Sequence, residues 1–403
     1  MRLTVAVAIG VLGGIGIIPL PAAHGLTFAV RNTEDSGAGS LRQAVLDANA
    51  AAGPDEIKFD PALEGQAIVL TGGPLEVRDS LSIAGPGPDR FLIRSDDPDA
   101  DLITIGGNGI SVELAGLALE GGEDGIQINA GTNGNAVTLT KVRVARQLTD
   151  DAVSVSGTLN RVTLRDCVLE AAEDNLSVDG VRNALTLIRT LVRSAKQDGI
   201  EIEGDANVLA VEDSTIGNNG KDPKSPNDGI DVDGSRNVVR LTQLTSSGNG
   251  EDGLDIEGPG NRVTIDGSTI AFNGRDGIKL QDPTRTSTLE IGNSIVAQNN
   301  GPDVAGAVTS TGYNLIGHET ASSGITGPGD QVGTTATPID ARLGPLESHG
   351  GATPVHPLGA GSPAINAGRP EFTPPPEFDQ RGPGFPRILL GRRDIGAFEA
   401  KAP

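Results

Sequence analysis

The sequence predicts an all-β fold, a right-handed parallel β-helix with three strands per coil, an amino-terminal helical cap and an irregular carboxy-terminal cap. Three observations predict it. An Asp-containing segment recurs seven times, short alternating strands follow each copy, and aromatic residues make up only 2% of the 403 residues. Stacked thin coils have a narrow core that Val, Ile, Leu and Ala can fill without many aromatic rings.

The repeat sets the length of one coil. Successive copies of the Asp segment are spaced by 27, 23, 24, 30, 24 and 24 residues. The copies begin at Asp124, Asp151, Asp174, Asp198, Asp228, Asp252 and Asp276. Insertions in a solenoid fall in loops, so the long spacings keep the stacked register.

Each coil contains three short strands that alternate apolar and polar residues, the period of a half-buried strand. One coil shows the pattern in Asp198-Gly-Ile-Glu-Ile, Asn207-Val-Leu-Ala-Val and Ser214-Thr-Ile. An Asn precedes the second strand of successive coils, as Asn207 does, and we call these residues the Asn column. Asn tolerates the backbone conformation of a sharp corner, and stacked Asn side-chain amides can hydrogen-bond along the stack. The Asp column is interpreted as a set of corners whose carboxylates accept backbone N–H groups two residues further on.

The chain divides into four predicted parts. These are a signal peptide at 1–25, an amino-terminal cap at 26–56 with a helix at 40–52, the β-helix at 57–319 and a loop-rich carboxy-terminal cap at 320–403. The first part has an apolar stretch and small residues before the expected cleavage after Gly25, so the protein is expected to be secreted. The last part is rich in Gly, Pro, Thr and Ser and should fold back over the last coils.

Composition excludes several partners. The net charge of −22 disfavours nucleic acid, because phosphate binding needs clustered Lys and Arg. Cys167 is the only cysteine and is expected to be a small buried apolar residue. No transmembrane segment is expected in the mature chain, and the oligomeric state is left open. His349 and His356 lie seven residues apart without a nearby Cys, which does not favour a zinc site, and no Ser-His-Asp elbow is present.

Several motifs resemble those of a known family. Gly39-Ser-Leu-Arg-Gln-Ala-Val-Leu-Asp-Ala-Asn49 resembles the opening of bacterial exported β-helix proteins named for a Cys-Ser-Leu-Arg-Glu-Ala (CSLREA) motif, with Gly39 and Gln43 in place of Cys and Glu. Motifs similar to those of the choice-of-anchor β-helix domain are Tyr313-Asn-Leu-Ile-Gly317, Gly344-Pro-Leu-Glu-Ser-His-Gly-Gly-Ala-Thr353, Gly361-Ser-Pro-Ala-Ile-Asn-Ala-Gly368, Asp379-Gln-Arg-Gly382 and Asp394-Ile-Gly-Ala-Phe-Glu399. The resemblance implies an exported protein and no single reaction. The coils also resemble the repeats of pectate-lyase-like carbohydrate-binding proteins and sugar hydrolases.

One strand face is expected to carry clustered charge. Residues three and five positions after each Asp should point outward, because the apolar residues between them fill the core. From the fourth coil onward these pairs are Glu201 and Glu203, Asp231 and Asp233, Asp255 and Glu257, then Lys279 and Gln281. We call this set the acidic face. Carboxylates about 5 Å apart repel by roughly 1 kcal/mol per pair even in water, so the face predicts a bound cation or raised pKa values.

The first functional hypothesis is non-catalytic binding of an extracellular polysaccharide or of cations through the acidic face. Ca²⁺ is the expected cation and no other cofactor is expected, because carboxylates of neighbouring coils offer the oxygen ligands that it prefers. The predicted metal ligands are Asp231, Asp233, Asp255 and Glu257. The predicted substrate-binding residues are Glu201, Glu203, Asp233 and Glu257.

The alternative is a Ca²⁺-dependent polysaccharide lyase or glycoside hydrolase on the same face. Lys279 would be the base, with Asp255 and Asp231 as further catalytic groups. A third reading is a solvated acidic surface that keeps a released protein soluble. The sequence alone does not decide whether the protein is an enzyme.

Overall fold

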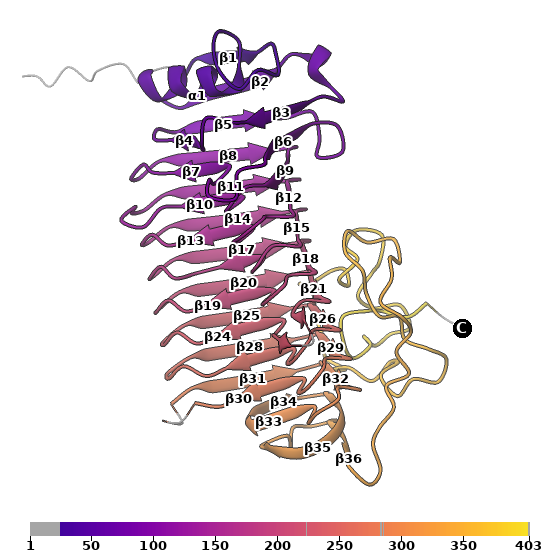
Figure 1. Cartoon of the computed structure of the whole chain (residues 1–403). Coiled ribbons are helices and arrows are strands. Elements are labelled where there is room, and N and C mark those ends of the chain that lie inside the picture. Colours follow the sequence, from indigo (N-terminus) through magenta and orange to yellow (C-terminus); the bar gives the residue numbers. More distant parts are fainter. Residues whose placement is uncertain (1–24, 223, 283, 285, 402–403) are drawn as a thin grey trace, which may run out of the picture.

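The computed structural model describes residues 25–401 apart from 223, 283 and 285. The predicted signal peptide therefore lies almost entirely outside the described residues. Within them the chain forms a right-handed parallel β-helix, as the repeat predicted, with coils stacked along one axis (Figure 1). In the described part no helix is long and apolar enough to cross a membrane.

The strands that follow the Asn column form a 12-stranded parallel sheet, which we call the first face. In order they are β1 (Thr27–Val30), β2 (Asp55–Phe59), β5 (Leu81–Ala84), β8 (Ser111–Ala115), β11 (Ala136–Thr140), β14 (Arg161–Arg165), β17 (Ala184–Ile188), β20 (Val208–Glu212), β25 (Val238–Thr242), β28 (Arg262–Asp266), β31 (Thr288–Gly292) and β34 (Thr309–Gly312).

The second face consists of the strands that follow the Asp column. They are β4 (Leu75–Val77), β7 (Ile103–Ile105), β10 (Ile126–Ile128), β13 (Val153–Val155), β16 (Leu176–Ser177), β19 (Ile200–Ile202), β24 (Ile230–Val232), β27 (Leu254–Ile256), β30 (Ile278–Leu280) and β33 (Val304–Ala307). This face carries the acidic residues.

The third face completes each coil. Its strands are β3 (Ala67–Leu70), β6 (Leu92–Ser95), β9 (Ala118–Gly121), β12 (Arg143–Ala145), β15 (Val168–Glu170), β18 (Leu191–Arg193), β21 (Thr215–Gly217), β26 (Thr245–Ser247), β29 (Thr269–Ala271), β32 (Ile295–Ala297), β35 (Leu315–Ser323) and β36 (Gln331–Thr334). It joins the second face through β33 and β35 in a 22-stranded sheet. The insertion that lengthens the interval between Asp198 and Asp228 to 30 residues contains a small hairpin, β22 (Lys221–Asp222) and β23 (Ser225–Pro226).

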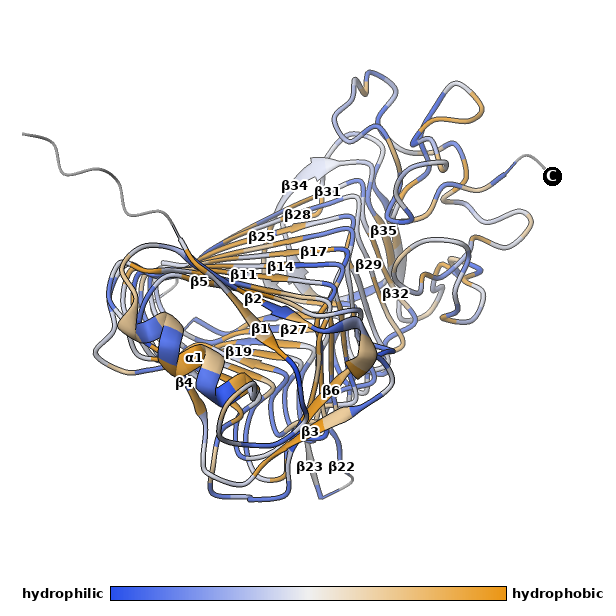
Figure 2. Cartoon of the chain, turned by 90° about the horizontal axis from the view of Figure 1, so that it is seen from above, coloured by the Kyte–Doolittle hydropathy of each residue, from blue (hydrophilic) through white to orange (hydrophobic). Residues whose placement is uncertain are grey.

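Equivalent residues of successive coils pair directly, so the core is a set of aliphatic columns. On the first face Val162, Leu185 and Leu209 stack in register, and all three are at most 1% exposed. Figure 2 looks down the stack and shows the three faces enclosing this narrow interior. Cys167 is buried and free, as the sequence predicted.

Both ends of the stack extend further than the predicted bounds of 57–319. The ladder starts at β1, which pairs with β2, and continues to β36. These outer coils lack the Asp-Gly signature, so the repeat alone could not reveal them. The predicted helix is present as α1 (Leu41–Ala50), capped by Ser40, whose Oγ accepts the Gln43 N–H at 3.1 Å. A short 3₁₀ turn, η1 (Pro61–Leu63), follows β2.

The segment after β36 forms irregular loops beside the third face (Figure 1). It docks through polar contacts: Thr245 Oγ1 donates to Gln380 Oε1 at 2.6 Å, and Gln380 Nε2 donates to the Ser214 carbonyl at 2.9 Å. Buried ion pairs hold it internally, including Arg387 with Glu399 at 3.0 Å. The Glu399 backbone N–H also donates to Asp379 Oδ2 at 2.8 Å. Two motifs of the predicted carboxy-terminal domain, around Asp379 and Glu399, are therefore bound to each other inside these loops.

Candidate functional site

The Asp column forms a continuous ladder between coils. Each Asp carboxylate accepts the backbone N–H of the equivalent Asp one coil further on: Asp198 accepts from Asp228 at 2.5 Å, Asp228 from Asp252 at 2.6 Å and Asp252 from Asp276 at 2.7 Å. The prediction that these residues lie in a line is confirmed. The expected local bond to an N–H two residues on is wrong, because the stacked register brings the N–H of the next coil within reach.

The first outward column of the acidic face lies in the predicted register. Glu201 pairs with Asp231, Asp231 with Asp255, and Asp255 with Lys279. These side chains are less exposed than the alternation predicted, and Asp255 is only 3% exposed. They are sunken because they lie against the Asp column, where oxygens of Asp228, Asp231 and Asp255 all fall within 4.8 Å of one another.

The second outward column forms an exposed rim beside the sunken column. Glu203, Asp233 and Glu257 are solvent-exposed. Glu257 accepts a hydrogen bond from Gln281 Nε2 at 2.9 Å. The predicted ligands Asp233 and Glu257 therefore belong to the rim, whereas Asp231 and Asp255 belong to the sunken cluster.

The centre of the site is the acidic cluster of Asp228, Asp231 and Asp255. Its oxygens are incompletely satisfied by the described residues: Asp231 Oδ1 is buried and accepts no hydrogen bond from them. A buried oxygen without a donor costs about 1–3 kcal/mol, so it is a position that a cation would stabilise. Sequence reasoning assigned Asp228 a corner role only, although it lies in the same coil as Asp231, three residues before it.

Burial and mutual repulsion raise the pKa values of the cluster. For Asp231 burial is the largest cause, followed by the charges of Asp233, Asp198 and Asp228, and the pKa rises to about 9. For Asp228 burial again dominates and raises the pKa to about 8. Three carboxylates that resist simultaneous ionisation are the electrostatic signature of a site that lacks a positive charge.

Lys279 supplies part of that positive charge. Its Nζ lies 2.5 Å from Asp255 Oδ2, 3.3 Å from Asp252 Oδ2 and 3.8 Å from Glu257 Oε1. Asp252 is fully buried, and its Oδ2 has this ion pair but no well-aligned hydrogen bond among the described residues. Burial opposes the charge of Lys279, but the hydrogen bond to Asp255 and the nearby carboxylates outweigh it and raise the Lys279 pKa. Lys279 is therefore a charged counter-ion of these carboxylates. A general base has to be neutral, so this arrangement does not favour the role of base predicted for Lys279.

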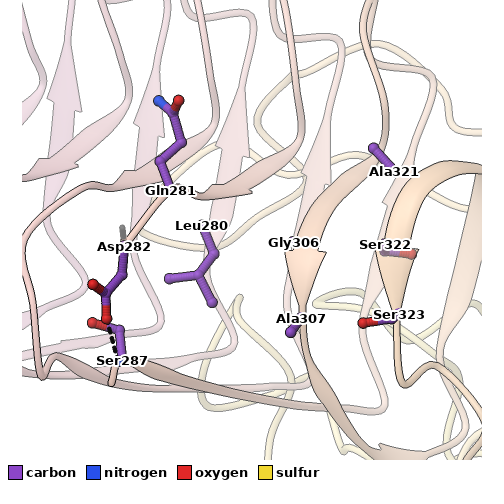
Figure 3. A pocket seen from close by; sticks show the side chains of 9 residues that line it. All are labelled: Leu280, Gln281, Asp282, Ser287, Gly306, Ala307, Ala321, Ser322 and Ser323. Atoms are coloured by element: carbon purple, nitrogen blue, oxygen red, sulfur yellow. Dashed lines mark hydrogen bonds between the residues drawn. The ribbon is translucent and has the colours of Figure 1, made fainter. Parts of the chain in front are cut away.

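An open hollow adjoins the acidic face at its carboxy-terminal end. It has a volume of about 600 Å³. Figure 3 shows its lining, which consists of Leu280, Gln281, Asp282, Ser287, Gly306, Ala307, Ala321, Ser322 and Ser323. Gln281 belongs to both the hollow and the rim, through its bond to Glu257. Ser287, Ser322 and Ser323 bring hydroxyl groups into the lining of this hollow.

Comparisons with known proteins agree with the fold. A family model described as "Right handed beta helix region" matches residues 151–322. "Probable pectate lyase C" of Emericella nidulans is 27% identical over 206 residues, which cover 47% of this chain and 44% of that protein. The chain thus matches less than half the length of this curated relative.

The crystal structure of pectate lyase Pel9A superposes with a TM-score of 0.61 at 14% identity, over 94% of this chain and 98% of that chain. Fold and comparisons together define the class as right-handed parallel β-helix proteins with a pectate lyase-like fold. Membership of the CSLREA and choice-of-anchor type within this class stays a prediction from the motifs around Gly39 and in the tail.

Proposed function

We propose that the protein binds a divalent cation, Ca²⁺ first of all, at the acidic cluster and binds an extracellular polysaccharide along the acidic face without cleaving it. The observation that carries the proposal is the convergence of oxygens from Asp228, Asp231 and Asp255 within 4.8 Å, with Asp231 Oδ1 buried and lacking a donor among the described residues.

The donor set fits a hard cation. It consists of carboxylate oxygens from adjacent coils, the ligands that Ca²⁺ prefers, with rim carboxylates nearby to complete the coordination. A bound divalent ion would supply the positive charge that offsets the repulsion between these groups. Asp231 is only partly buried, and the exposed rim residues Asp233 and Glu257 each lie two residues beyond a cluster residue on the same strand face, where a carboxylate or hydroxyl of a glycan could approach.

The charge of the acidic face and the similarity to a pectate lyase together indicate which class of glycan binds. The face is acidic, so an anionic polysaccharide needs a bridging cation, and the 27% identical relative is named as a probable pectate lyase. We therefore propose a uronate polysaccharide as the partner, held through the cation and through Glu201, Glu203, Asp233 and Glu257. Export of the protein is also part of the proposal and rests on residues 1–25 and on the family resemblance.

A calcium titration tests the proposal. Ca²⁺ should raise the melting temperature of the full chain, since a ligand at 100 times its Kd stabilises the folded state by about 2.7 kcal/mol. Asp231→Asn should remove most of this rise. Glu212→Gln, an exposed carboxylate on the first face, is the matched control and should keep it. Equal calcium responses in both variants would contradict the site.

Polysaccharide cleavage is the second candidate function, because the fold and the curated relative resemble pectate lyases. It would use Lys279, Asp255 and Asp231. Incubation with polygalacturonate and Ca²⁺, followed by ultraviolet detection of unsaturated ends, separates the two functions. The contacts of Lys279 predict no cleavage, together with calcium-dependent retention of the protein on the polymer. Unsaturated products that disappear in Lys279→Met would establish the lyase instead.

A further inference from the structure

A serine and a histidine meet where the carboxy-terminal loops dock on the third face. Ser247, the last residue of β26, lies with its Oγ 2.8 Å from His356 Nε2. The residues are 109 positions apart in sequence, which is why no local motif reveals the contact. Both are nearly buried, with exposed fractions of 2% and 4%.

The hydrogen bonds fix the histidine tautomer. His356 Nδ1 lies 2.7 Å from the Gly344 carbonyl oxygen, which can only accept, so Nδ1 carries the proton. Nε2 is then the acceptor, and the Ser247 hydroxyl donates to it. A serine that donates to the free nitrogen of a histidine, whose other nitrogen is held by a third group, is the geometry of an activated nucleophile.

The contact lies in an open cavity of about 380 Å³. Its lining is Asn218, Ser247, Gly248, Phe272, Leu343, Gly344, Pro345, Leu346 and His356. The Phe272 ring lies tilted against the imidazole, with centroids 5.0 Å apart and an interplanar angle of 46°. Leu343, Leu346 and Phe272 give this cavity apolar walls that suit a short acyl chain.

The residue after Ser247 is Gly248, at φ +71°, so no side chain stands between Ser247 and its neighbours Asn218 and Lys221. A side-chain carbon there would lie 3.1 Å from the Asn218 amide oxygen and 3.9 Å from Lys221 Nζ. Of these two neighbours only the Lys221 ammonium group can donate a hydrogen bond, because the nearest Asn218 atom is its acceptor oxygen. A positive charge near Ser247 stabilises the negative charge of the tetrahedral intermediate of acyl transfer.

We propose that Ser247 and His356 form a nucleophile–base pair that hydrolyses small acyl esters, of which O-acetyl groups on a polysaccharide are the natural class. The Ser247 Oγ forms a bond to the ester carbonyl carbon while its proton passes to His356 Nε2. Collapse of the intermediate breaks the carbon–oxygen bond to the sugar, whose oxygen takes that proton. Water then attacks the acyl-serine by the same route and releases the carboxylic acid.

Burial lowers the His356 pKa, so the imidazole is neutral and able to accept a proton at neutral pH. The Gly344 carbonyl stabilises the imidazolium that forms, although less strongly than a carboxylate would. We therefore expect slow turnover compared with an enzyme that has a full triad. The activity is independent of the acidic cluster, which lies on the second face.

The test uses a fluorophosphonate probe and 4-nitrophenyl acetate with the full chain. We expect the probe to label Ser247, identified by peptide mass spectrometry, and the ester to be hydrolysed. Ser247→Ala should abolish both, and His356→Gln should lower the hydrolysis rate by about 100-fold or more. The residues that pair with Ser247 one coil before and after are Gly217 and Ala271, so alanine fits this column without disturbing the stack.

Thr245→Val is the matched control. Thr245 lies on the same strand and also binds the docked loops, through Gln380, but has no base beside it. If Ser247 and His356 only fasten the loops, Thr245→Val will resemble Ser247→Ala in every readout. Absence of labelling at Ser247 in the folded wild-type protein, or hydrolysis that persists in Ser247→Ala, would overturn the proposal. Calcium binding should be unchanged in Ser247→Ala, which keeps this result separate from the function proposed for the acidic face.

Discussion

Lys279 determines how the acidic face is balanced when no metal is bound. Its ammonium group contacts Asp255, Asp252 and Glu257, and it stands one coil beyond the cluster centred on Asp231. A divalent cation in the acidic cluster and the Lys279 ammonium group would both bind the Asp255 carboxylate. Each therefore lowers the affinity of the site for the other, as two ligands of one anionic group must.

Lys279→Met tests this competition. Removing one partner of a largely buried ion pair should destabilise the calcium-free protein by about 3 kcal/mol. The freed Asp255 should bind Ca²⁺ about tenfold or more tightly, because the tethered cation no longer competes for it. Isothermal titration with Ca²⁺, together with thermal unfolding in EDTA, measures both effects.

Lys196→Met provides the control, since Lys196 is exposed near the same corner of an earlier coil and contacts only the Leu148 carbonyl among the described residues. It should leave calcium affinity and stability nearly unchanged. A calcium affinity that falls in Lys279→Met would show that Lys279 supports the metal site rather than competing with it.

At the scale of the elements, corner ladders hold the strands in register. One ladder joins the amide oxygen of each Asn of the first face to the N–H of the equivalent Asn in the preceding coil, as in Asn207 to Asn183 at 2.7 Å. A second ladder runs between the third and second faces, where Asn249 Nδ2 donates to Asn273 Oδ1 at 3.0 Å and Asn273 Nδ2 donates to Asn299 Oδ1 at 2.9 Å. Asn207 also donates its Nδ2 to the Gly180 carbonyl at 2.9 Å, so one side chain satisfies two buried backbone groups of the preceding coil.

Asn273→Ala should therefore destabilise the protein by about 2–3 kcal/mol, because it leaves buried N–H groups and an amide of neighbouring coils without partners. Chemical denaturation measures the change in free energy of unfolding. Asn300→Ala is the control at an exposed neighbouring position and should change stability by less than about 0.5 kcal/mol. A similar small change in both variants would mean that the ladder is not a main source of stability.

The two ladders differ in whether they could be predicted from the sequence. Periodicity predicted the coils, α1 and the line of Asp residues, because each depends on local spacing. It missed the second Asn ladder, although an Asn recurs at positions 219, 249, 273 and 299. It could not predict the contact of Ser247 with His356 or the sunken position of Asp255, because both depend on where distant segments pack. The outermost coils were not predicted, because their sequences lack the Asp-Gly repeat.

For the whole molecule, buried carboxyls set the dependence of stability on pH. Several outside the acidic cluster have raised pKa values, with burial as the largest cause in each. The values are about 8 for Asp124, about 7 for Asp151, about 6 for Asp213 and about 7 for Glu399. Carboxyls that shift the other way include Asp35, whose pKa Arg42 lowers despite burial, and Glu170, whose pKa Arg143 and Arg193 lower despite burial.

We therefore expect the protein to be most stable in mildly acidic solution. Between their unfolded pKa values near 4 and their folded values, the raised carboxyls keep protons in the folded state that the unfolded chain has lost. Their contribution to stability is complete below about pH 4, decreases as pH rises above that value, and is gone once pH has passed the folded pKa values of about 6 to 8. Asp35 and Glu170 act oppositely and lose their contribution only as pH falls below about 4, so they place the optimum above that value.

The melting temperature in EDTA should accordingly fall as pH rises from 5 to 9, a slope set mainly by the Asp column. Asp124→Asn should flatten this slope, since an amide has the shape of the protonated carboxyl and no charge to bury, while Glu212→Gln at an exposed site should not. A melting temperature that rises over the same interval would show that these carboxyls are ionised without strain in the folded protein. The electrostatic argument for cation binding by the acidic face would then fail with it, because both rest on the same buried negative charge.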